Sequence, residues 1–207
     1  MPASVLKSTK PPIPIDGGDG SSPRGDDFYY KEHVKWIGLW LFLSAVIMLF
    51  AAFTSAVIIR RESGDWKPIY FPSFLLLNTM ILIISSFTFE ISKRKLRSLQ
   101  EHGYHFWLGI TVVLGFAFLG GQIYVWKLME GQGYFLPTNP HASFFYLLTC
   151  LHGLHLLGGI LWLVFLFFGT WQIKNFKSSL TSARLASTYW HFLTFLWIYL
   201  YCLLRIV

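Results

Sequence analysis

The chain has 207 residues, of which 54% are hydrophobic and 19% aromatic, whereas only 13% are charged. This composition, with a mean hydropathy of +0.51, excludes an ordinary soluble domain and favours a polytopic membrane protein. The net charge of +7 does not indicate a nucleic-acid partner, because the basic residues flank apolar segments, where membrane topology explains them. We expect an all-α, polytopic membrane helix bundle that binds no nucleic acid.

The first 35 residues form a polar segment. Residues 7–14 are rich in Lys and Pro, and residues 17–27 in Gly, Ser and Asp, a composition that cannot bury a hydrophobic core. We expect residues 1–35 to be a cytoplasmic tail that is disordered on its own. The two cysteines, Cys150 and Cys202, lie in apolar runs without the spacing of a disulfide framework, a haem attachment site or a zinc site.

Five apolar runs follow the polar segment, each long enough to cross a bilayer as a helix. We expect transmembrane helices at about 36–59, 70–91, 105–127, 142–169 and 186–206. Pro72 would fall in the first turn of the second helix, where its missing N–H costs little.

The second predicted helix carries a polar stripe and ends in a cluster of charges. The stripe would hydrogen-bond to neighbouring helices and consists of Asn78, Thr79, Ser85, Ser86 and Thr88. Glu90 precedes Lys93 and Arg94 by three and four residues, which places all three within reach on one helix face. Glu90 is therefore either part of an ion pair at the helix end or a carboxylate that relays protons.

The third predicted helix contains small residues and one strongly polar one. Ala117 and Gly121 have the small-xxx-small spacing that lets a neighbouring helix approach closely. We expect Gln122 to be a hydrogen-bonded packing residue rather than a ligand.

The run 142–171 contains no charged side chain but two histidines, His152 and His155. Their i,i+3 spacing places both imidazoles on one helix face, next to glycines that admit a close neighbour. A titratable pair at membrane depth is costly and is therefore a functional candidate. Three roles are open: histidines that hydrogen-bond at a buried helix interface, a direct role in proton transfer, and ligation of a metal or haem.

The helix rise argues against a haem held between the fourth and fifth helices. At about 1.5 Å per residue, His155 would lie roughly 21 Å from the cytoplasmic end of the fourth helix, and His191 about 8 Å from that of the fifth. The two axial histidines of a haem need to lie near one plane, and an offset of about 13 Å between His155 and His191 does not allow this. Because the sequence also lacks a phosphate-binding loop and a nucleophile–base motif, we expect no catalytic, cofactor-binding or metal site in this chain.

The basic residues predict the orientation of the chain in the membrane. Twelve of the 17 Lys and Arg residues fall in the tail, the second-to-third connection and the fourth-to-fifth connection, and five fall on the other side. Since Lys and Arg accumulate in cytoplasmic segments, we expect the N-terminus in the cytoplasm and the C-terminus outside the membrane.

Three stretches carry a family signature. The first runs from Phe144-Phe145 through Thr149-Cys150-Leu151-His152-Gly153-Leu154-His155 to Gly158-Gly159. The second is Tyr189-Trp190-His191-Phe192, followed by Trp197 and Tyr201, and the third is Leu77-Asn78-Thr79. Their order and spacing over 36–207 resemble the cytochrome c oxidase subunit III family of the haem–copper oxidases, in the short five-helix form common in bacteria.

The resemblance implies a non-catalytic accessory subunit, subunit III, of a terminal haem–copper oxidase of aerobic respiration. Such a subunit binds no haem or copper itself, because these lie in the partner subunits. It packs on the catalytic subunit I in a bacterial inner membrane, binds phospholipid, and supports proton uptake, oxygen access and turnover stability. An accessory subunit of a quinol oxidase or of a nitric oxide reductase would look similar, and an independent membrane transporter is an alternative of a different class.

Two positions depart from the family pattern. Ala45 stands where the family usually has a buried carboxylate, and Thr194 replaces the acid of the C-terminal signature. A proton role would have to rest on the histidines or on loop groups. The cations of the predicted 170–185 loop are candidates for lipid-headgroup contacts, or are solvated charges that only set topology; they are Lys174, Lys177 and Arg184.

Overall fold

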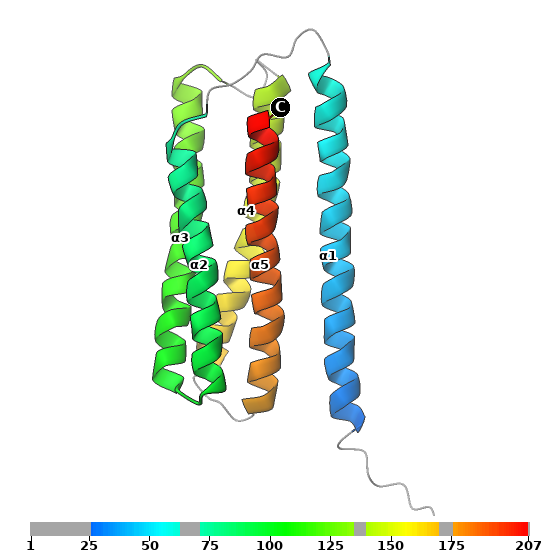
Figure 1. Ribbon diagram of the computed structural model, residues 1–207, viewed down its shortest axis with the longest axis vertical. Coiled ribbons are helices and arrows are strands. Elements are labelled where there is room, and N and C mark those ends of the chain that lie inside the picture. The colour runs from blue at the N-terminus through cyan, green and yellow to red at the C-terminus, as the bar shows by residue number, and fades with distance from the viewer. Residues whose placement is uncertain (1–25, 63–70, 135–139, 170–175, 207) are drawn as a thin grey trace, which may run out of the picture.

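Five helices make up the described part of the chain (Figure 1), which comprises residues 26–62, 71–134, 140–169 and 176–206 of this computed structural model. They are α1 (Asp26–Arg61), α2 (Phe74–Arg97), α3 (Glu101–Gly131), α4 (Pro140–Gly169) and α5 (Phe176–Ile206). Each contains a run long and apolar enough to cross a membrane, and no strand occurs within these ranges. The predicted all-α bundle of five transmembrane helices is confirmed.

Two helices begin earlier than their apolar runs. Helix α1 begins at Asp26 rather than near residue 36, so residues 26–35 of the predicted tail are helical. Helix α5 begins at Phe176 rather than near residue 186, which places Lys177 and Arg184 on a helix instead of in a loop. A hydropathy pattern indicates only the apolar part of a helix, so the predicted helices did not include the polar first turns of α1 and α5. Residues 1–25 and Lys174 lie outside the described residues.

Both ends of α2 differ from the prediction, and the connection from α2 to α3 is shorter than predicted. Helix α2 begins at Phe74, so Pro72 precedes the helix rather than lying in its first turn. At its other end α2 continues to Arg97, and its basic residues form the last helical turns rather than a loop. A tight turn at Leu99, whose φ is 57°, then leads into α3.

Helices α2, α3, α4 and α5 form a closed ring, in which α2 packs on α3 and α5, and α4 packs on α3 and α5. Helix α1 lies outside this ring against α4 and α5 (Figure 1). The largest fully buried side chains include Trp190 and Trp197 of α5, Phe118 of α3 and Phe89 of α2. The hydrophobic core is therefore mainly the interior of the four-helix ring.

Candidate functional site

Helix α2 is attached to both of its neighbours by hydrogen bonds from its polar stripe. Towards α5, Ser85 Oγ accepts a bond from Trp190 Nε1 at 3.2 Å, and Thr79 Oγ1 accepts one from Trp197 Nε1 at 3.0 Å. Towards α3, the hydroxyls of Thr88 and Thr111 lie 2.9 Å apart. The interhelical role predicted for the stripe is confirmed.

Asn78 extends the stripe to the backbone of α3. Its Nδ2 donates to the Phe118 carbonyl at 3.2 Å and to Gln122 Oε1 at 3.3 Å. A β-carbon built on Gly121 would come within 2.3 Å of Asn78 Oδ1, so this asparagine fits only because position 121 is glycine. The predicted packing role of Gln122 and the close approach at Gly121 are both present.

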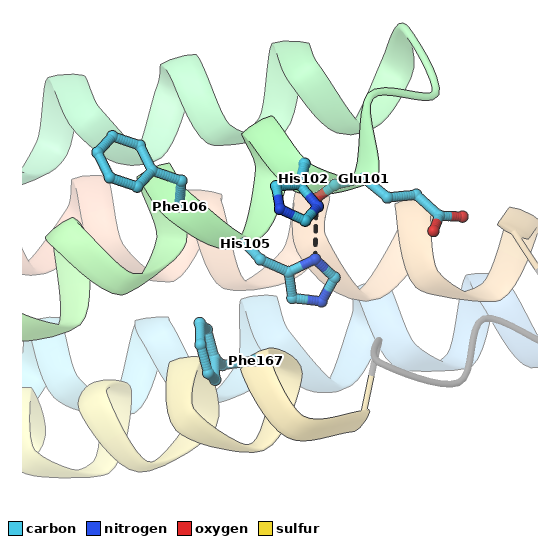
Figure 2. Close-up of a pocket in the computed structure, with 5 residues that line it drawn as sticks. All are labelled: Glu101, His102, His105, Phe106 and Phe167. Atoms are coloured by element: carbon cyan, nitrogen blue, oxygen red, sulfur yellow. Dashed lines mark hydrogen bonds between the residues drawn. The ribbon is translucent and has the colours of Figure 1, made fainter.

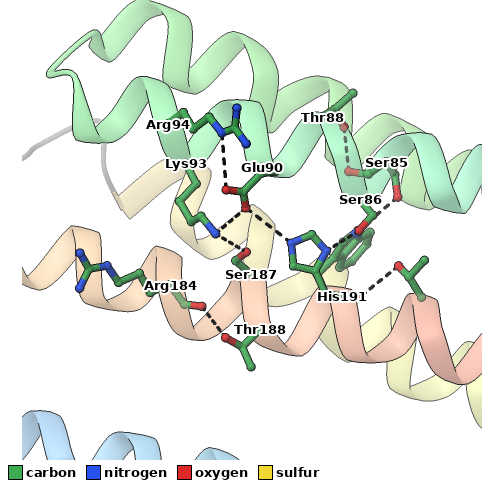
Figure 3. A network of polar contacts seen from close by, with 12 residues as sticks. Ser85, Ser86, Thr88, Glu90, Lys93, Arg94, Arg184, Ser187, Thr188 and His191 are labelled. Carbon is green, nitrogen blue, oxygen red and sulfur yellow. Dashed lines mark hydrogen bonds and ion pairs between the residues drawn. The ribbon is translucent and has the colours of Figure 1, made fainter.

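A second set of polar contacts lies nearer the end of α2 and is centred on Glu90 (Figure 3). Its carboxylate lies 2.5 Å from Lys93 Nζ, 3.7 Å from Arg94 Nε and 3.6 Å from His191 Nε2. The predicted ion pairs with Lys93 and Arg94 are present. The contact with His191 adds a link to α5 that the sequence interpretation missed.

Two serines complete this Glu90 network. Ser86 Oγ is hydrogen-bonded to His191 Nδ1, and Lys93 Nζ donates to Ser187 Oγ at 3.1 Å. The sequence does contain a signal for this network. Ser86 and Glu90 are four residues apart on α2, and Ser187 and His191 are four residues apart on α5, so each pair lies on one face of its helix.

The exposed fractions of these side chains indicate which charges can stabilise the contact between α2 and α5. The side chains of Lys93, Glu90 and His191 are 14%, 29% and 33% exposed, whereas Arg94 is 74% exposed. An exposed ion pair contributes little because water and salt screen it. We therefore assign the helix–helix link to Glu90, Lys93 and His191.

The depth expected for His191 is wrong, since α5 begins ten residues before the predicted start. Counted from Phe176, His191 lies about 22 Å along α5, close to the depth of about 21 Å of His155 along α4 from Gly169. The two rings nevertheless contact different helices: His191 meets Ser86 of α2, and His155 meets Phe42 and Phe50 of α1.

His152 and His155 do not share one environment, contrary to the expectation of a common face. His152 is completely buried between Phe118 of α3 and Trp197 of α5, with ring centroids 6.1 and 5.0 Å away. No described group hydrogen-bonds to either of its ring nitrogens. An i,i+3 pair is separated by about 60° around a helix axis, which suffices here to place the two rings in different interfaces.

His155 points towards α1 and is held by its own helix. Its Nδ1 donates to the Leu151 carbonyl at 2.8 Å, and its ring lies 5.9 Å from that of Phe50. Its own carbonyl accepts a hydrogen bond from Tyr189 Oη at 2.9 Å. The predicted role as a hydrogen-bonding interface residue therefore describes the geometry of His155 better than that of His152.

Trp190 of α5 contacts all three other helices of the four-helix ring. Its indole donates to Ser85 of α2, and its ring packs on two glycines. A β-carbon built at Gly115 of α3 would lie 3.0 Å from the ring, and one built at Gly159 of α4 would lie 3.3 Å from it. Gly159 thus allows close approach, as expected, but to a ring from α5.

The remaining candidate positions lie outside the Glu90 network. Thr194, which replaces the family's acid, is buried and donates to the Trp190 carbonyl at 3.0 Å. Ala45 on α1 is exposed, as is Arg184 on α5. The side chain of Lys177 and the whole of Lys174 lie outside the described residues.

The described side chains offer no ready-made metal centre. Within the described ranges, no three His, Cys, Asp or Glu residues gather closely enough to hold a metal ion. The arrangement can instead fix α2 against α5, and it offers a chain of titratable and hydroxyl groups from Lys93 through Glu90 and His191 to Ser86.

Comparison with known proteins identifies the family. The sequence model for Cytochrome c oxidase subunit III matches residues 27–206. A cytochrome c oxidase subunit 3 from Thermostichus vulcanus is 32% identical over 91% of this chain and 94% of its own length. The corresponding proteins of Synechocystis and of Bacillus sp. strain PS3 are 34% and 30% identical, covering 84% and 81% of this chain and 76% and 83% of their own lengths. This chain therefore belongs to the cytochrome c oxidase subunit III family.

Proposed function

We propose that this chain is the non-catalytic subunit III of a terminal haem–copper oxidase of aerobic respiration, where it packs on the catalytic subunit I. The observation that carries the proposal is the family match, which covers nearly all of the described chain. Membership of this family implies membership of a multi-subunit oxidase complex in a membrane. The five spanning helices agree with a multi-pass location.

Haem and copper belong, in this proposal, to the partner subunits. The three histidines of α4 and α5 that were candidate ligands support that division because they point to different neighbours: His152 to α3 and α5, His155 to α1, and His191 to α2. Two axial ligands for one haem have to face each other across one site, and these rings do not.

The accessory role includes lipid binding and support of proton uptake, oxygen access and turnover stability. For protons, the candidate groups are Glu90 and His191 with Lys93, because they are the partly buried titratable residues that contact one another across α2 and α5. For lipid, Arg184 is exposed near the start of α5, and Lys174 and Lys177 precede it in the sequence. Cations at this position suit anionic headgroups.

The proposed orientation in a bacterial inner membrane has the N-terminus in the cytoplasm and the C-terminus outside. It rests on the excess of Lys and Arg on one side. The start of α1 and the end of α5 lie at opposite ends of the bundle (Figure 1), as an odd number of spans requires. Reactivity of single introduced cysteines at Glu32 and Arg205, in a variant with Cys150 and Cys202 replaced by serine, checks this assignment from each side of the membrane.

The direct test is purification of the tagged chain from its native membranes in mild detergent, with partner identification by mass spectrometry and a reduced-minus-oxidised spectrum. An a-type or o-type haem signal with a copper-containing large subunit supports the proposal, and the identity of the other co-purified subunits separates cytochrome c oxidase from quinol oxidase. A b/c-type signal with a reductase subunit would favour the nitric oxide reductase alternative. A colourless chain without a large partner would contradict an accessory role and favour a transporter.

A further inference from the structure

A groove runs between α3 and α4 at the end of the bundle where α3 begins (Figure 2). It consists of two adjoining hollows of about 430 Å³ each, which share His105, Phe106 and Phe167. The outer hollow also contacts Glu101 and His102, and the inner one is lined further by Gly109, Ile110, Val113 and Leu114. We call the two hollows together the α3–α4 groove.

The groove changes from polar to apolar along its length. At its outer end are a carboxylate and two imidazoles, and Figure 2 shows the Glu101 carboxylate pointing away from Phe106 and Phe167. Its inner part has aromatic and aliphatic walls, with Phe106 and Val113 each 66% exposed. An amphiphile lying parallel to α3 would meet polar groups only at its outer end.

The dimensions of the groove suit one leaflet of a bilayer. From Glu101 to Leu114 α3 rises about 20 Å, whereas half of the hydrocarbon core is about 15 Å thick. A groove of this length that begins at the headgroup level reaches most of the way to the bilayer centre. Gly109 keeps its floor low, because a β-carbon there would already lie 3.5 Å from the Phe167 ring.

We propose that the α3–α4 groove binds one phospholipid with an ethanolamine headgroup. One acyl chain lies along Phe106, Gly109 and Val113, and the ammonium group lies at Glu101. An ionised carboxylate is negatively charged and only accepts hydrogen bonds, so it attracts a cationic amine, while the Lys95 side chain of α2, beside Gly103 in the same turn of α3 as Glu101, offers a cation to the phosphate. His102 supplies an imidazole for the neighbouring phosphate. This inference rests on the lipid-binding part of the proposed function, and it names a site on α3 and α4 rather than on the cations of α5.

The test measures lipid retained by the full chain, purified with its partners into nanodiscs that contain equal amounts of phosphatidylethanolamine and phosphatidylglycerol with different acyl masses. Native mass spectrometry counts each lipid on the chain. Two variants alter the groove: Glu101→Gln removes the headgroup charge, and Gly109→Leu fills the floor. Two matched controls lie on the same helix outside the groove: Glu130→Gln, which is exposed, and Gly120→Leu, which has open space around it.

We expect the unaltered chain to retain one phosphatidylethanolamine. Glu101→Gln should reduce the preference for it over phosphatidylglycerol about fivefold, the factor that roughly one charge contact at a membrane surface supplies. Gly109→Leu should remove both lipids, and the two control variants should retain lipid like the unaltered chain.

Equal retention in the groove variants and their controls would overturn the proposal, as would a preference for phosphatidylglycerol over phosphatidylethanolamine. The same preparations show whether a haem-containing large subunit co-purifies. Its absence would contradict the accessory-subunit function while the lipid count still tests the groove.

Discussion

Helices α1 and α2 both carry an apolar run that can span a membrane, yet 44% of that run is buried inside the chain in α2 and 22% in α1. Helix α2 lies in the four-helix ring, and its polar side chains bond to α3 and α5. Helix α1 lies outside the ring. The more apolar run, that of α1, is therefore the less buried one, and the polar residues within the run of α2 account for its stronger attachment.

The contacts of α1 are fewer: besides ring contacts it buries Leu39, Leu43, Val46 and Val57, and Glu32 accepts a hydrogen bond from Thr181 of α5. Phe42 and Phe50 pack against His155, and Thr54 Oγ1 lies 3.0 Å from Tyr199 Oη. Many large apolar side chains of α1 remain exposed, among them Ile37, Trp40, Leu41, Ile47, Met48, Ile58 and Ile59. In a membrane complex this face can meet lipid or another subunit, which is where we expect α1 to gain its remaining stability.

The largest expected loss of stability is that of a Trp190 variant in the four-helix ring, and Trp40 of the outer helix α1 provides the comparison. Trp190→Ala should lower the free energy of unfolding of the full chain in detergent by about 3–5 kcal/mol, because it leaves a cavity among three helices. Trp40→Ala, at a position 58% exposed on α1, should change it by less than about 1 kcal/mol. Thermal or chemical unfolding measures both, and equal losses would contradict the ring as the stable unit.

Glu90→Gln should destabilise the chain by about 1–2 kcal/mol, because Lys93 is then left half-paired in a mostly buried position. The matched change Glu62→Gln, at an exposed position just after α1, should have almost no effect. Unfolding of the two variants under the same conditions makes the comparison.

A double variant separates the two roles of Glu90. If the carboxylate serves only as an ion-pair partner, Glu90→Gln with Lys93→Gln should restore most of the stability and leave turnover of the assembled oxidase unchanged. Turnover that stays low while stability recovers would instead indicate a proton-relay role.

Two adjacent glycines of α3 give a finer test of the α2 attachment. Gly121→Ala should cost about 1–2 kcal/mol, since the new methyl group displaces the Asn78 amide from its bonds to Phe118 and Gln122. Gly120→Ala has no atom within 4 Å of the new group and should be neutral or slightly stabilising. Comparable losses in both variants would show that the Asn78 contacts contribute nothing.

The smallest effect is expected at the outer helix. Tyr199→Phe removes the hydroxyl that meets Thr54 of α1 and should cost about 0.6 kcal/mol, the average for a hydrogen bond between membrane helices. Ser85→Ala, which removes the acceptor of Trp190, should cost more because it leaves a buried N–H unpaired. A larger loss in Tyr199→Phe would reverse the comparison.

The sequence was sufficient for the number of helices and for the polar stripe of α2, because long apolar runs and isolated polar residues within them are local patterns. It was not sufficient for the partners of those residues. The link between Glu90 and His191 depends on which faces of α2 and α5 meet, and this is a tertiary arrangement that the local pattern of one helix does not specify. The α3–α4 groove was missed for another reason, since Glu101 and His102 preceded the predicted start of the third helix.

Backbone amide hydrogen exchange tests the central comparison most directly. In the full chain in detergent, the amides of α2 should exchange more slowly than those of α1, because opening α2 breaks contacts with two neighbours. Assembly with the partner subunits should slow exchange mainly in α1. Protection of α1 equal to that of α2 in the isolated chain would contradict the account.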